Sequence, residues 1–343
     1  MTQGYIGKDP DGNYIITSTS RGDATPDEED VFAEYLAEGG ANIVYYILGD
    51  GPRPYSGRLL RARKDKPFIQ STMKQYEAFH KHFATLFPSE NLIELIPVRL
   101  DPEFIAALNY DLENTFSGRL KQWDKDRVAE DEAMGMFITN MTAGPDEYVV
   151  DAKPKWLAQS PNAPADAVRC RTCALRAQRR VENTKKHAGS ADFCPLALVA
   201  DDEQTRERAA TALVELQGQS LPSGAAPSLV HYLTREGYKL LDALRKHQAA
   251  LDPTGILSVK VEATVPEDYL KAMTLRDCSL FIRGNVKVSH NIEARLADLD
   301  LKHPHPDKVA YWKATERGLI DGGWYTNTEE NHTPETICLL ARK

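Results

Sequence analysis

Long apolar runs are missing from this chain of 343 residues, since none approaches the roughly 20 residues that would span a bilayer. The first residues, MTQGYIGKDPDGNY, also lack the charged-then-apolar pattern of a secretory signal peptide. We therefore expect an intracellular protein, cytoplasmic or nuclear, with no membrane partner. Hydrophobic residues make up 42% of the chain and charged residues 27%, which is typical of a globular protein long enough for two domains.

An overall excess of positive charge is also missing. The chain has 42 Lys and Arg against 50 Asp and Glu, a formal net charge of −8. Proteins that bind nucleic acid through bulk electrostatics are basic, so we expect no nucleic-acid partner. Between Lys153 and Lys186, however, nine Lys and Arg are accompanied by only Asp166 and Glu182. This local excess on an acidic protein indicates a confined anion site, and a solvated basic face is the alternative interpretation.

Cysteine is scarce, and five cysteines in an intracellular chain do not indicate a disulfide framework. Three of them and one histidine have the spacing C-x2-C-x13-H-x6-C. This spacing would supply four ligands for tetrahedral zinc, namely Cys170, Cys173, His187 and Cys194. The proline-rich approach offers no strand for a thioredoxin-like redox pair. The other interpretation is that the cysteines are small buried hydrophobes.

Hydrophobic periodicity predicts a mixture of strands and helices, preceded by an exposed lead-in at residues 1–30. The predicted strands cover 42–49 and 57–64, joined as a hairpin, then 92–100, 135–144 and 147–156, with short β-type runs in 272–285 and 293–312. The predicted helices cover 71–88, 201–217 and 228–248. A polar break at the end of the run 135–144 indicates a hinge between two lobes.

Two patterns point to phosphoryl chemistry. A small-residue turn, EGGAN, precedes the first strand of the hairpin, and Arg61 lies on the second. Kinase-like folds hold nucleotide phosphates with such a turn and a strand-borne cation. Asp277 and Asp298 end β-type runs 21 residues apart, as do the hydroxyl-orienting and magnesium-binding aspartates of these folds. Aspartates at strand ends without this role are the common alternative, and the absence of His-Arg-Asp and Asp-Phe-Gly excludes an ordinary protein kinase.

Several blocks of the chain together resemble the inositol-pentakisphosphate 2-kinase family in its short fungal form. The blocks, in order, are EGGANIVYYILG, GRLLRARK, VVDAKPKW, CRTCALRAQRR with FCPLAL, TLRDCSLFI, and DLDLK. The resemblance implies an α+β, two-lobed kinase-like fold, with an antiparallel-sheet N-lobe at 1–143 and a mixed α/β C-lobe at 144–343. It also implies transfer of the γ-phosphoryl group of ATP, with Mg²⁺, to the axial 2-hydroxyl of inositol pentakisphosphate, which gives inositol hexakisphosphate (phytate). We expect a monomer.

The resemblance further assigns roles to individual residues. ATP would be bound by Gly39, Gly40, Ala41, Asn42, Arg61, Asn140, Met141 and Asp151. Asp277 would be the catalytic base and Asp298 the magnesium ligand. Substrate phosphates would be bound by Arg119, Lys153, Lys155, Arg171, Arg179, Lys302 and Lys308.

Two features of other family members are missing from this chain. No Asn/Arg-rich segment occurs in residues 199–260, and the late His, Cys-x-x-Cys, His zinc cluster of the plant form is absent, so zinc at 170–194 would be a different site. Two other functions stay open: a catalytically weak inositol-phosphate-binding scaffold with a zinc-braced basic segment, and a zinc-stabilised nucleic-acid module at 153–194. The presence of both Asp277 and Asp298 favours the kinase over the scaffold, and the acidity of the chain disfavours the nucleic-acid module.

Overall fold

A computed structural model describes residues 1–343 except 23–24, 26–27, 50–54, 56, 115–118, 183–192, 217–220, 261–263, 289–290, 327–336 and 343. The described residues form two units, Met1–Lys81 with Ile93–Asn140, and His82–Leu92 with Met141–Lys343. This division reflects packing, and the functional boundary expected between residues 143 and 144 stays a prediction. Among the described residues, no helix combines the length and the apolar character needed to cross a membrane.

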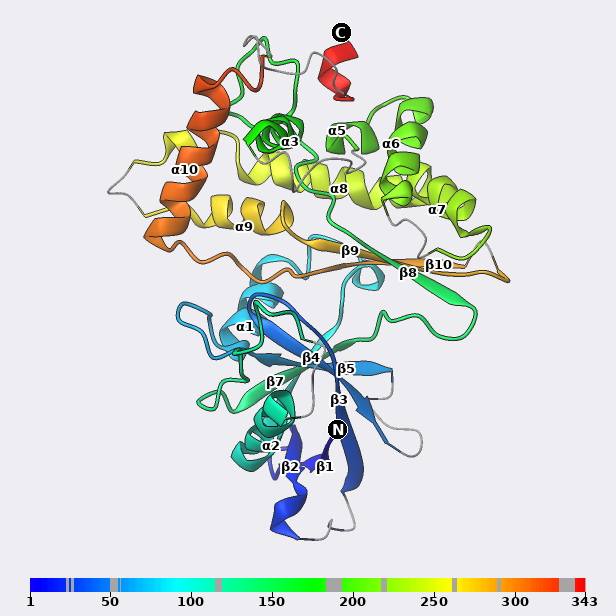
Figure 1. The fold of residues 1–343 in the computed structure, drawn as a ribbon, viewed down its shortest axis with the longest axis vertical. Helices are drawn as coiled ribbons and strands as arrows, with labels where there is room; N and C mark the ends of the chain where they lie inside the picture. The colour runs from blue at the N-terminus through cyan, green and yellow to red at the C-terminus, as the bar shows by residue number, and fades with distance from the viewer. Residues whose placement is uncertain are drawn as a thin grey trace. The chain divides into compact units, whose positions relative to one another are not determined.

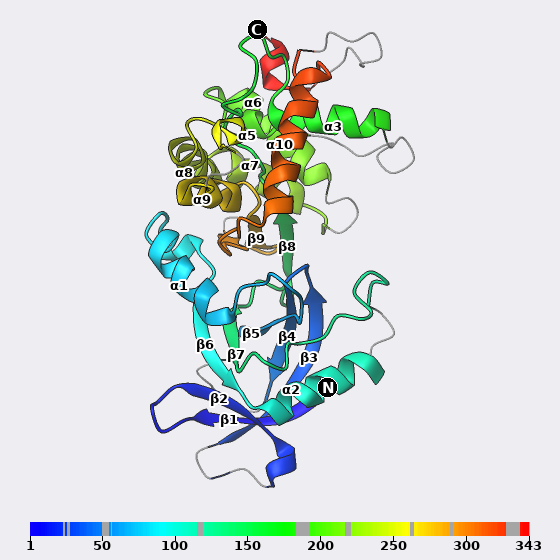
Figure 2. The same ribbon diagram turned by 90° about the vertical axis from the view of Figure 1, so that its left-hand side faces the viewer.

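The first unit is built on a closed barrel with the strand order β1-β2-β6-β7-β5-β4-β3 (Figure 2). Its strands are β1 (Thr2–Lys8), β2 (Tyr14–Ser18), β3 (Glu29–Glu38), β4 (Asn42–Leu48), β5 (Arg58–Arg63), β6 (Leu95–Leu100) and β7 (Met134–Thr139). Strand β2 pairs with β6 in parallel, and the other neighbouring pairs are antiparallel. A parallel pair needs a long connection, and here β3, β4, β5 and helix α1 (Thr72–His82) lie between the two strands in sequence.

This barrel corrects the expected fold. The predicted antiparallel sheet of a two-lobed kinase-like fold is wrong, because the sheet is mixed and closes on itself. The α+β class is confirmed, since helices accompany both sheets. The error arose at residues 1–30, where polar residues suggested a lead-in although Ile6 and Ile16 of β1 and β2 are buried in the core. These two strands close the barrel, which leaves it no open edge.

Helix α2 (Pro102–Asn114) covers β1 and β2 with a stripe of buried residues at helical spacing, Phe104, Ile105, Leu108 and Leu112. The predicted hairpin is confirmed by the antiparallel pairing of β4 with β5, in which Val44 faces Arg61. The predicted helix at 71–88 is shorter than expected and ends at His82. Residues 39–41 form the turn from β3 into β4, where the Gly39 N–H donates to the Asn42 carbonyl over 2.9 Å.

The second unit contains a three-stranded antiparallel sheet with the order β10-β9-β8, and helices α8 and α9 lie over one of its faces (Figure 1). Its strands are β8 (Glu147–Ala152), β9 (Ser279–Asn285) and β10 (Ile292–Ala297). Its helices are α3 (Arg171–Glu182), α5 (Pro195–Leu198), α6 (Glu203–Glu215), α7 (Ala225–Thr234), α8 (Glu236–Leu251), α9 (Glu267–Leu275) and α10 (Pro306–Asp321). The predicted helix at 201–217 is confirmed as α6. The one at 228–248 is two helices, broken at Arg235, whose φ of −120° and ψ of −83° are not helical.

The register of this small sheet brings distant segments to one edge. Ala152 at the end of β8 pairs with Leu280, and Ala297 at the end of β10 pairs with Ser279 at the start of β9. The residues that follow β8, precede β9 and follow β10 therefore converge, although they are far apart in sequence.

Candidate active site

The convergent edge of the second sheet holds three lysines and two aspartates, which we call the lysine–carboxylate cluster: Lys153, Lys155, Lys302, Asp277 and Asp298. The Lys302 Nζ lies 2.7 Å from Asp277 Oδ2, and the Lys155 Nζ lies 3.3 Å from Asp277 Oδ1. The Lys153 Nζ donates to the backbone carbonyl of Asp277 over 2.9 Å. Each oxygen of the Asp277 side chain thus faces an ammonium group.

Asp298 is joined to the same group through one oxygen. Its Oδ2 accepts hydrogen bonds from the Ser279 hydroxyl at 2.8 Å and from the Lys153 Nζ at 3.3 Å. Its side chain is 62% exposed, so it is open to solvent for binding a cation. Lys153 therefore links the two aspartates, because it contacts the backbone of one and the carboxylate of the other.

Two members of the cluster have an uncommon backbone conformation. Lys155 has a φ of 63° and Asp298 a φ of 56°, in the left-handed region that side chains with a Cβ rarely occupy. Such residues cost of order 1–3 kcal/mol each and tend to gather at functional sites. Both residues lie shortly after the end of a strand, Lys155 after β8 and Asp298 after β10.

The lysines control the ionisation of Asp277. Desolvation would raise its pKa, but the positive charges of Lys302, Lys155 and Lys153 outweigh desolvation and hold the pKa below its usual range. Desolvation lowers the pKa of Lys155, and the nearby charges of Lys153 and Lys302 lower it further, against the opposing attraction of Asp277. The cluster therefore keeps a charged carboxylate among crowded cations, which is an environment that attracts anions.

Asp151, at an exposed position of β8, lies within the electrostatic reach of this cluster. Partial desolvation raises its pKa, Lys153 opposes the rise, and the charge of Asp298 adds to it. Two carboxylates that disfavour each other's ionisation can be stabilised by a divalent cation, for which carboxylate oxygens are suitable ligands. Asp298, whose carboxylate is exposed, and Asp151 are therefore the candidates at this edge for holding a magnesium ion.

A buried stack of side chains supports the cluster from within the unit. The ring of Trp156, which follows Lys155, has the guanidinium carbon of Arg276 at 3.7 Å from its centroid and that of Arg171 at 4.3 Å. Arg276, which precedes Asp277, pairs with buried Asp252 at 2.7 Å. The stack supports the backbone that carries both Lys155 and Asp277, and no sequence motif predicted it.

Gln248 of α8 ties the same two segments together. Its side chain is fully buried. Its Oε1 accepts a hydrogen bond from the Leu157 N–H at 2.9 Å. Its Nε2 donates hydrogen bonds to the backbone carbonyls of Lys155 and Leu275, each at 3.0 Å. No motif marked Gln248 in the sequence, where it looks like an ordinary polar residue near a helix end.

The other residues of this unit that were predicted to bind substrate lie outside the lysine–carboxylate cluster. Arg171 is buried, and its Nε donates to Glu316 Oε2 at 2.8 Å. Arg179 is exposed in the last turn of α3, and Lys308 is exposed in the first turn of α10. Within the described residues, neither forms an ion pair with Asp277 or Asp298. The structure thus brings together Lys153, Lys155 and Lys302, and their roles as substrate ligands stay predictions.

In the first unit, the predicted nucleotide-binding turn contains two glycines that the fold itself does not require. Gly39 and Gly40 are exposed, neither has a left-handed φ, and a Cβ built on either would meet nothing within 4 Å. The fold of the described chain does not itself require glycine there, although glycine allows a ligand to approach the backbone closely. Arg61 lies on β5 beside this hairpin, facing Val44 of β4 and Met136 of β7. Asn140 and Met141 follow β7.

Arg119, predicted to bind substrate, lies at the base of the same turn. It binds Glu38 through both ends of its guanidinium group, with Nε and Nη2 at 2.7 and 2.8 Å from the two carboxylate oxygens. Glu38 also pairs with the fully buried Lys64 at 2.7 Å. Desolvation would raise the pKa of Glu38, but its bonds to Arg119 and Lys64 outweigh desolvation and lower it. Arg119 therefore anchors the residue that precedes the glycines.

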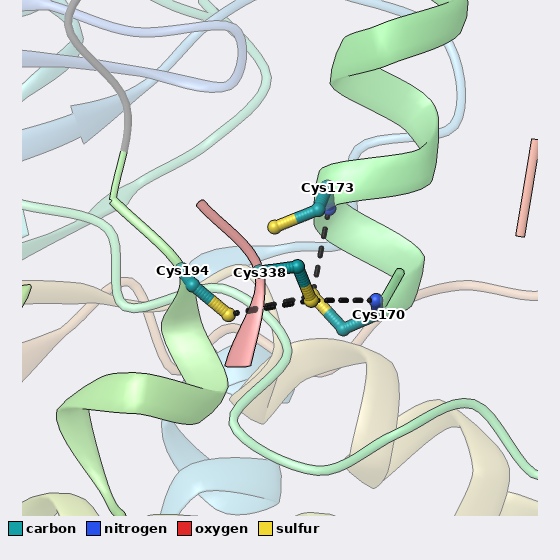
Figure 3. Close-up of side chains that lie close together, drawn as sticks. All are labelled: Cys170, Cys173, Cys194 and Cys338. Atoms are coloured by element: carbon teal, nitrogen blue, oxygen red, sulfur yellow. Dashed lines mark hydrogen bonds between the residues drawn. The ribbon is translucent and has the colours of Figure 1, made fainter. Parts of the chain in front are cut away.

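The predicted zinc ligands Cys170, Cys173 and Cys194 come together in the second unit, and Cys338 joins them (Figure 3). The four sulfur atoms lie within 4.8 Å of one another, and all four side chains are buried. The fourth predicted ligand, His187, lies outside the described residues. Cys338 is far from the others in sequence, so no local spacing could have identified it.

Comparisons with known proteins give a consistent result. A family model described as inositol-pentakisphosphate 2-kinase matches residues 35–318. A curated inositol-pentakisphosphate 2-kinase from Yarrowia lipolytica is 35% identical over 196 residues, which are 57% of this chain and 58% of the relative. The alignment therefore spans less than two thirds of the relative's length. The range matched by the family model includes the lysine–carboxylate cluster and ends before Cys338.

Proposed function

We propose, because this chain belongs to the inositol-pentakisphosphate 2-kinase family, that it transfers the γ-phosphoryl group of ATP to the axial 2-hydroxyl of inositol pentakisphosphate and so forms inositol hexakisphosphate. The observation that carries this proposal is the lysine–carboxylate cluster, in which Asp277 has ammonium groups at 2.7 and 3.3 Å. A polyanionic alcohol needs both components, since cations bind its phosphates and a carboxylate receives its hydroxyl.

The substrate explains the crowding of cations. Five phosphates bring up to about ten negative charges near neutral pH, because each second pKa is around 6. Lysine ammonium groups held near one another repel, and phosphates would relieve that repulsion. Lys153, Lys155 and Lys302 have side chains that are 39%, 36% and 30% exposed, so each can reach a ligand. We assign the more distant Arg179 and Lys308 to outer phosphates, and Arg171 and Arg119 to positioning through their buried carboxylate partners.

Asp277 is proposed as the group that accepts the hydrogen bond of the 2-hydroxyl. Its lowered pKa keeps it ionised over the physiological range, so it is always an acceptor but a weak base. Phosphoryl transfer has a loose transition state in which positioning and charge neutralisation dominate. When substrate phosphates attract Lys302 and Lys155, the carboxylate loses counter-charge and becomes a better acceptor for the proton.

Magnesium fits the carboxylates at this edge. Asp298 carries an exposed carboxylate with its Oδ2 held by Ser279 at 2.8 Å, and its charge helps to raise the pKa of Asp151. A divalent ion there would offset the mutual repulsion of the two carboxylates. Bound magnesium would neutralise charge on the nucleotide phosphates, while Lys153 holds the Asp298 side chain in position.

The nucleotide-binding residues are proposed from the family match together with the local backbone. Neither the backbone conformation nor the surroundings of Gly39 and Gly40 require glycine. Their presence therefore supports a role in which phosphates approach the backbone closely. Ala41 and Asn42 continue that turn, and Arg61 supplies a guanidinium that can bind two phosphate oxygens. Asn140 and Met141 are proposed for the adenine and Asp151 for the ribose or for magnesium.

We also propose that the protein acts as a monomer in the cytoplasm or nucleus. The described cysteines are free and buried, which fits a compartment where thiols stay reduced. Sedimentation of the purified chain and microscopy of a tagged copy test these two statements.

The direct test is to incubate the purified protein with magnesium ATP and inositol pentakisphosphate and to follow phosphorus NMR. The expected product has six phosphates, the new one at the axial position. Saturable binding of the pentakisphosphate without ATP consumption would instead support the scaffold. If no phosphate appears at the axial position although intact ATP is present throughout the incubation, the proposed reaction is wrong.

A further inference from the structure

We propose that Thr274 of α9 is a positioning residue for the pair formed by Lys302 and Asp277, because its side chain holds the backbone of Lys302 and its carbonyl holds that of Asp277. This role rests on the proposed function, in which Lys302 binds a substrate phosphate and Asp277 receives the hydroxyl. Thr274 itself is fully buried, so it acts through these two residues and does not touch a ligand.

The segment that carries Lys302 has no regular structure of its own. Residues 298–305 lie between β10 and α10 and belong to no helix or strand. Leu301 packs against the apolar cluster that includes Leu270 of α9, which holds the segment against that helix. Apolar contacts are non-directional, so this packing does not by itself orient Lys302.

The Thr274 hydroxyl supplies a directional contact. Thr274 lies in the last turn of α9, and its Oγ1 donates to the Leu270 carbonyl, four residues earlier, at 3.0 Å. Threonine often forms this bond within a helix. Because a hydroxyl has one proton and two lone pairs, the same oxygen can also accept, and it accepts the Lys302 N–H at 3.0 Å. The Asp300 carbonyl lies farther from Oγ1, at 3.4 Å.

The backbone of the same residue holds the other member of the pair. The Thr274 carbonyl accepts the Asp277 N–H at 3.0 Å, in the turn that follows α9. One residue is thus bonded to both backbones, and the side chains that they carry meet where the Lys302 Nζ lies 2.7 Å from Asp277 Oδ2. Only the bond to Lys302 depends on the Thr274 side chain, so a substitution can remove it alone.

The orientation of Lys302 matters because a lysine side chain is long and flexible. A fixed backbone reduces the conformational entropy that is lost when the ammonium group binds an anion. The other two lysines of the lysine–carboxylate cluster do not depend on this bond, since Lys155 lies 3.3 Å from the Asp277 carboxylate and Lys153 donates to the Asp277 carbonyl. We therefore expect loss of the Thr274 hydroxyl to weaken substrate binding without abolishing it.

The experiment replaces Thr274 by valine in the full chain, because valine has nearly the same shape without the hydroxyl. Titration calorimetry without ATP measures the Kd for inositol pentakisphosphate, and we expect Thr274→Val to raise it about fivefold. Thr274→Ser keeps the hydroxyl and should restore the wild-type Kd. Thr234→Val is the matched control, because Thr234 is a buried threonine of α7 that also donates to a carbonyl four residues earlier, and it should leave the Kd unchanged.

A double-mutant cycle shows whether Thr274 acts through Lys302. Lys302→Met alone should raise the Kd, and adding Thr274→Val should then change it no further. Amide hydrogen exchange gives a second readout that needs no ligand. The Lys302 amide should exchange slowly in the wild type and in Thr274→Ser, and faster in Thr274→Val.

The outcomes separate this role from the proposed function. An unchanged Kd in Thr274→Val, or an equal effect of that change with and without Lys302, overturns the role and leaves the proposed function standing. A wild-type protein that binds no pentakisphosphate overturns the proposed function and this role with it. Where Thr274→Val fails to fold, the wild type decides, since rapid exchange of its Lys302 amide would contradict the hydrogen bond to Thr274.

Discussion

At Asp277, the important property is that the carboxylate remains charged in spite of its partly buried position. Desolvation acts against ionisation, and three lysines overcome it. A carboxylate whose pKa is lowered in this way is a weak base while the lysines surround it, so in the proposed reaction it first orients the hydroxyl and receives the proton only when substrate phosphates draw the lysines away. If the same lysines bind the substrate phosphates, as proposed, substrate binding is coupled to the activation of the carboxylate.

Replacing Asp277 by Asn should therefore separate catalysis from binding. We expect Asp277→Asn to lower kcat on the order of a hundredfold or more, because a neutral amide is a weaker hydrogen-bond acceptor and cannot receive the hydroxyl proton during transfer. The KM for the pentakisphosphate should be unchanged or lower, since a negative charge leaves the anion site. Steady-state kinetics measure both, with Asp268→Asn as control, because exposed Asp268 pairs only with Lys271 among the described ion pairs. A wild-type kcat in Asp277→Asn would remove Asp277 from the mechanism.

Lys155 should set the alkaline limit of activity. Its pKa lies below the ordinary lysine value, so it loses its proton, and with it the proposed phosphate contact, as pH rises through the lowered pKa. The profile of kcat/KM reports the free enzyme, and it should fall on the alkaline side earlier than an ordinary lysine, with a pKa of about 10.4, would allow.

Lys155→Arg keeps the charge at every accessible pH, so the alkaline fall should move to higher pH. Lys246→Arg is the control, as Lys246 is 68% exposed and pairs with Asp242 on α8, and its profile should match wild type. Identical alkaline limbs in wild type and Lys155→Arg would exclude this role for Lys155.

At the scale of elements, local sequence patterns predicted several helices and strands, whereas features that depend on long-range pairing were not predicted. The β4–β5 hairpin and helix α6 could be predicted because turn residues and periodicity lie within a few positions of one another. Strands β1 and β2 were missed because their polar surroundings hide a few buried residues such as Ile6 and Ile16. Lys302 and Asp298 were found through a motif, whereas Gln248 and Cys338 depend on partners about 90 and 170 residues away.

Helix α8 should influence the site through Gln248. Gln248→Ala removes the side-chain partner of the buried Leu157 N–H and of the Lys155 carbonyl, at about 1–3 kcal/mol for each group left unsatisfied. The Leu275 carbonyl loses one of two donors, because it also accepts a hydrogen bond from the Cys278 thiol at 3.2 Å. We expect a loss of stability of at least about 2 kcal/mol in denaturant titrations. We also expect a lower kcat at temperatures where the variant is folded, because Lys155 and Asp277 lose their common support.

The matched control is Gln178→Ala. Gln178 is half-buried on α3 and donates a solvent-exposed hydrogen bond to Glu182 over 2.9 Å, so its loss should change stability by less than about 0.5 kcal/mol. Equal stabilities for the Gln248 and Gln178 variants would contradict the bridging role. A destabilised Gln248→Ala with unchanged kcat would limit that role to folding.

At the scale of the whole molecule, an acidic chain carries a small cationic site. The formal charge of −8 opposes the approach of polyanions at long range, while the three partly exposed lysines of the proposed site would attract them at short range. Ionic strength should therefore raise the KM for the pentakisphosphate severalfold between about 0.05 and 0.3 M salt, because screening lengths fall to below about 10 Å. The kcat should change little, since transfer occurs inside the site.

Kinetics at several potassium chloride concentrations test this expectation, and double-stranded DNA at the same phosphate concentration is the comparison. DNA should inhibit weakly even at low salt, as the net charge of −8 on the chain opposes the approach of an extended polyanion. Strong inhibition by DNA would instead revive the nucleic-acid interpretation of residues 153–194.

The left-handed backbone at Lys155 and Asp298 has a consequence for how this chain would evolve without its activity. Glycine would relieve up to roughly 1–2 kcal/mol at each position, so selection for folding alone should let both drift to glycine, with asparagine the next most tolerated residue. A mutational scan of positions 155 and 298 should rank glycine above the natural Lys155 and Asp298 when variants are scored by folding yield. The same scan scored by product formation should rank glycine last. Such a result would show that Lys155 and Asp298 lower the stability of the fold and are retained for the reaction.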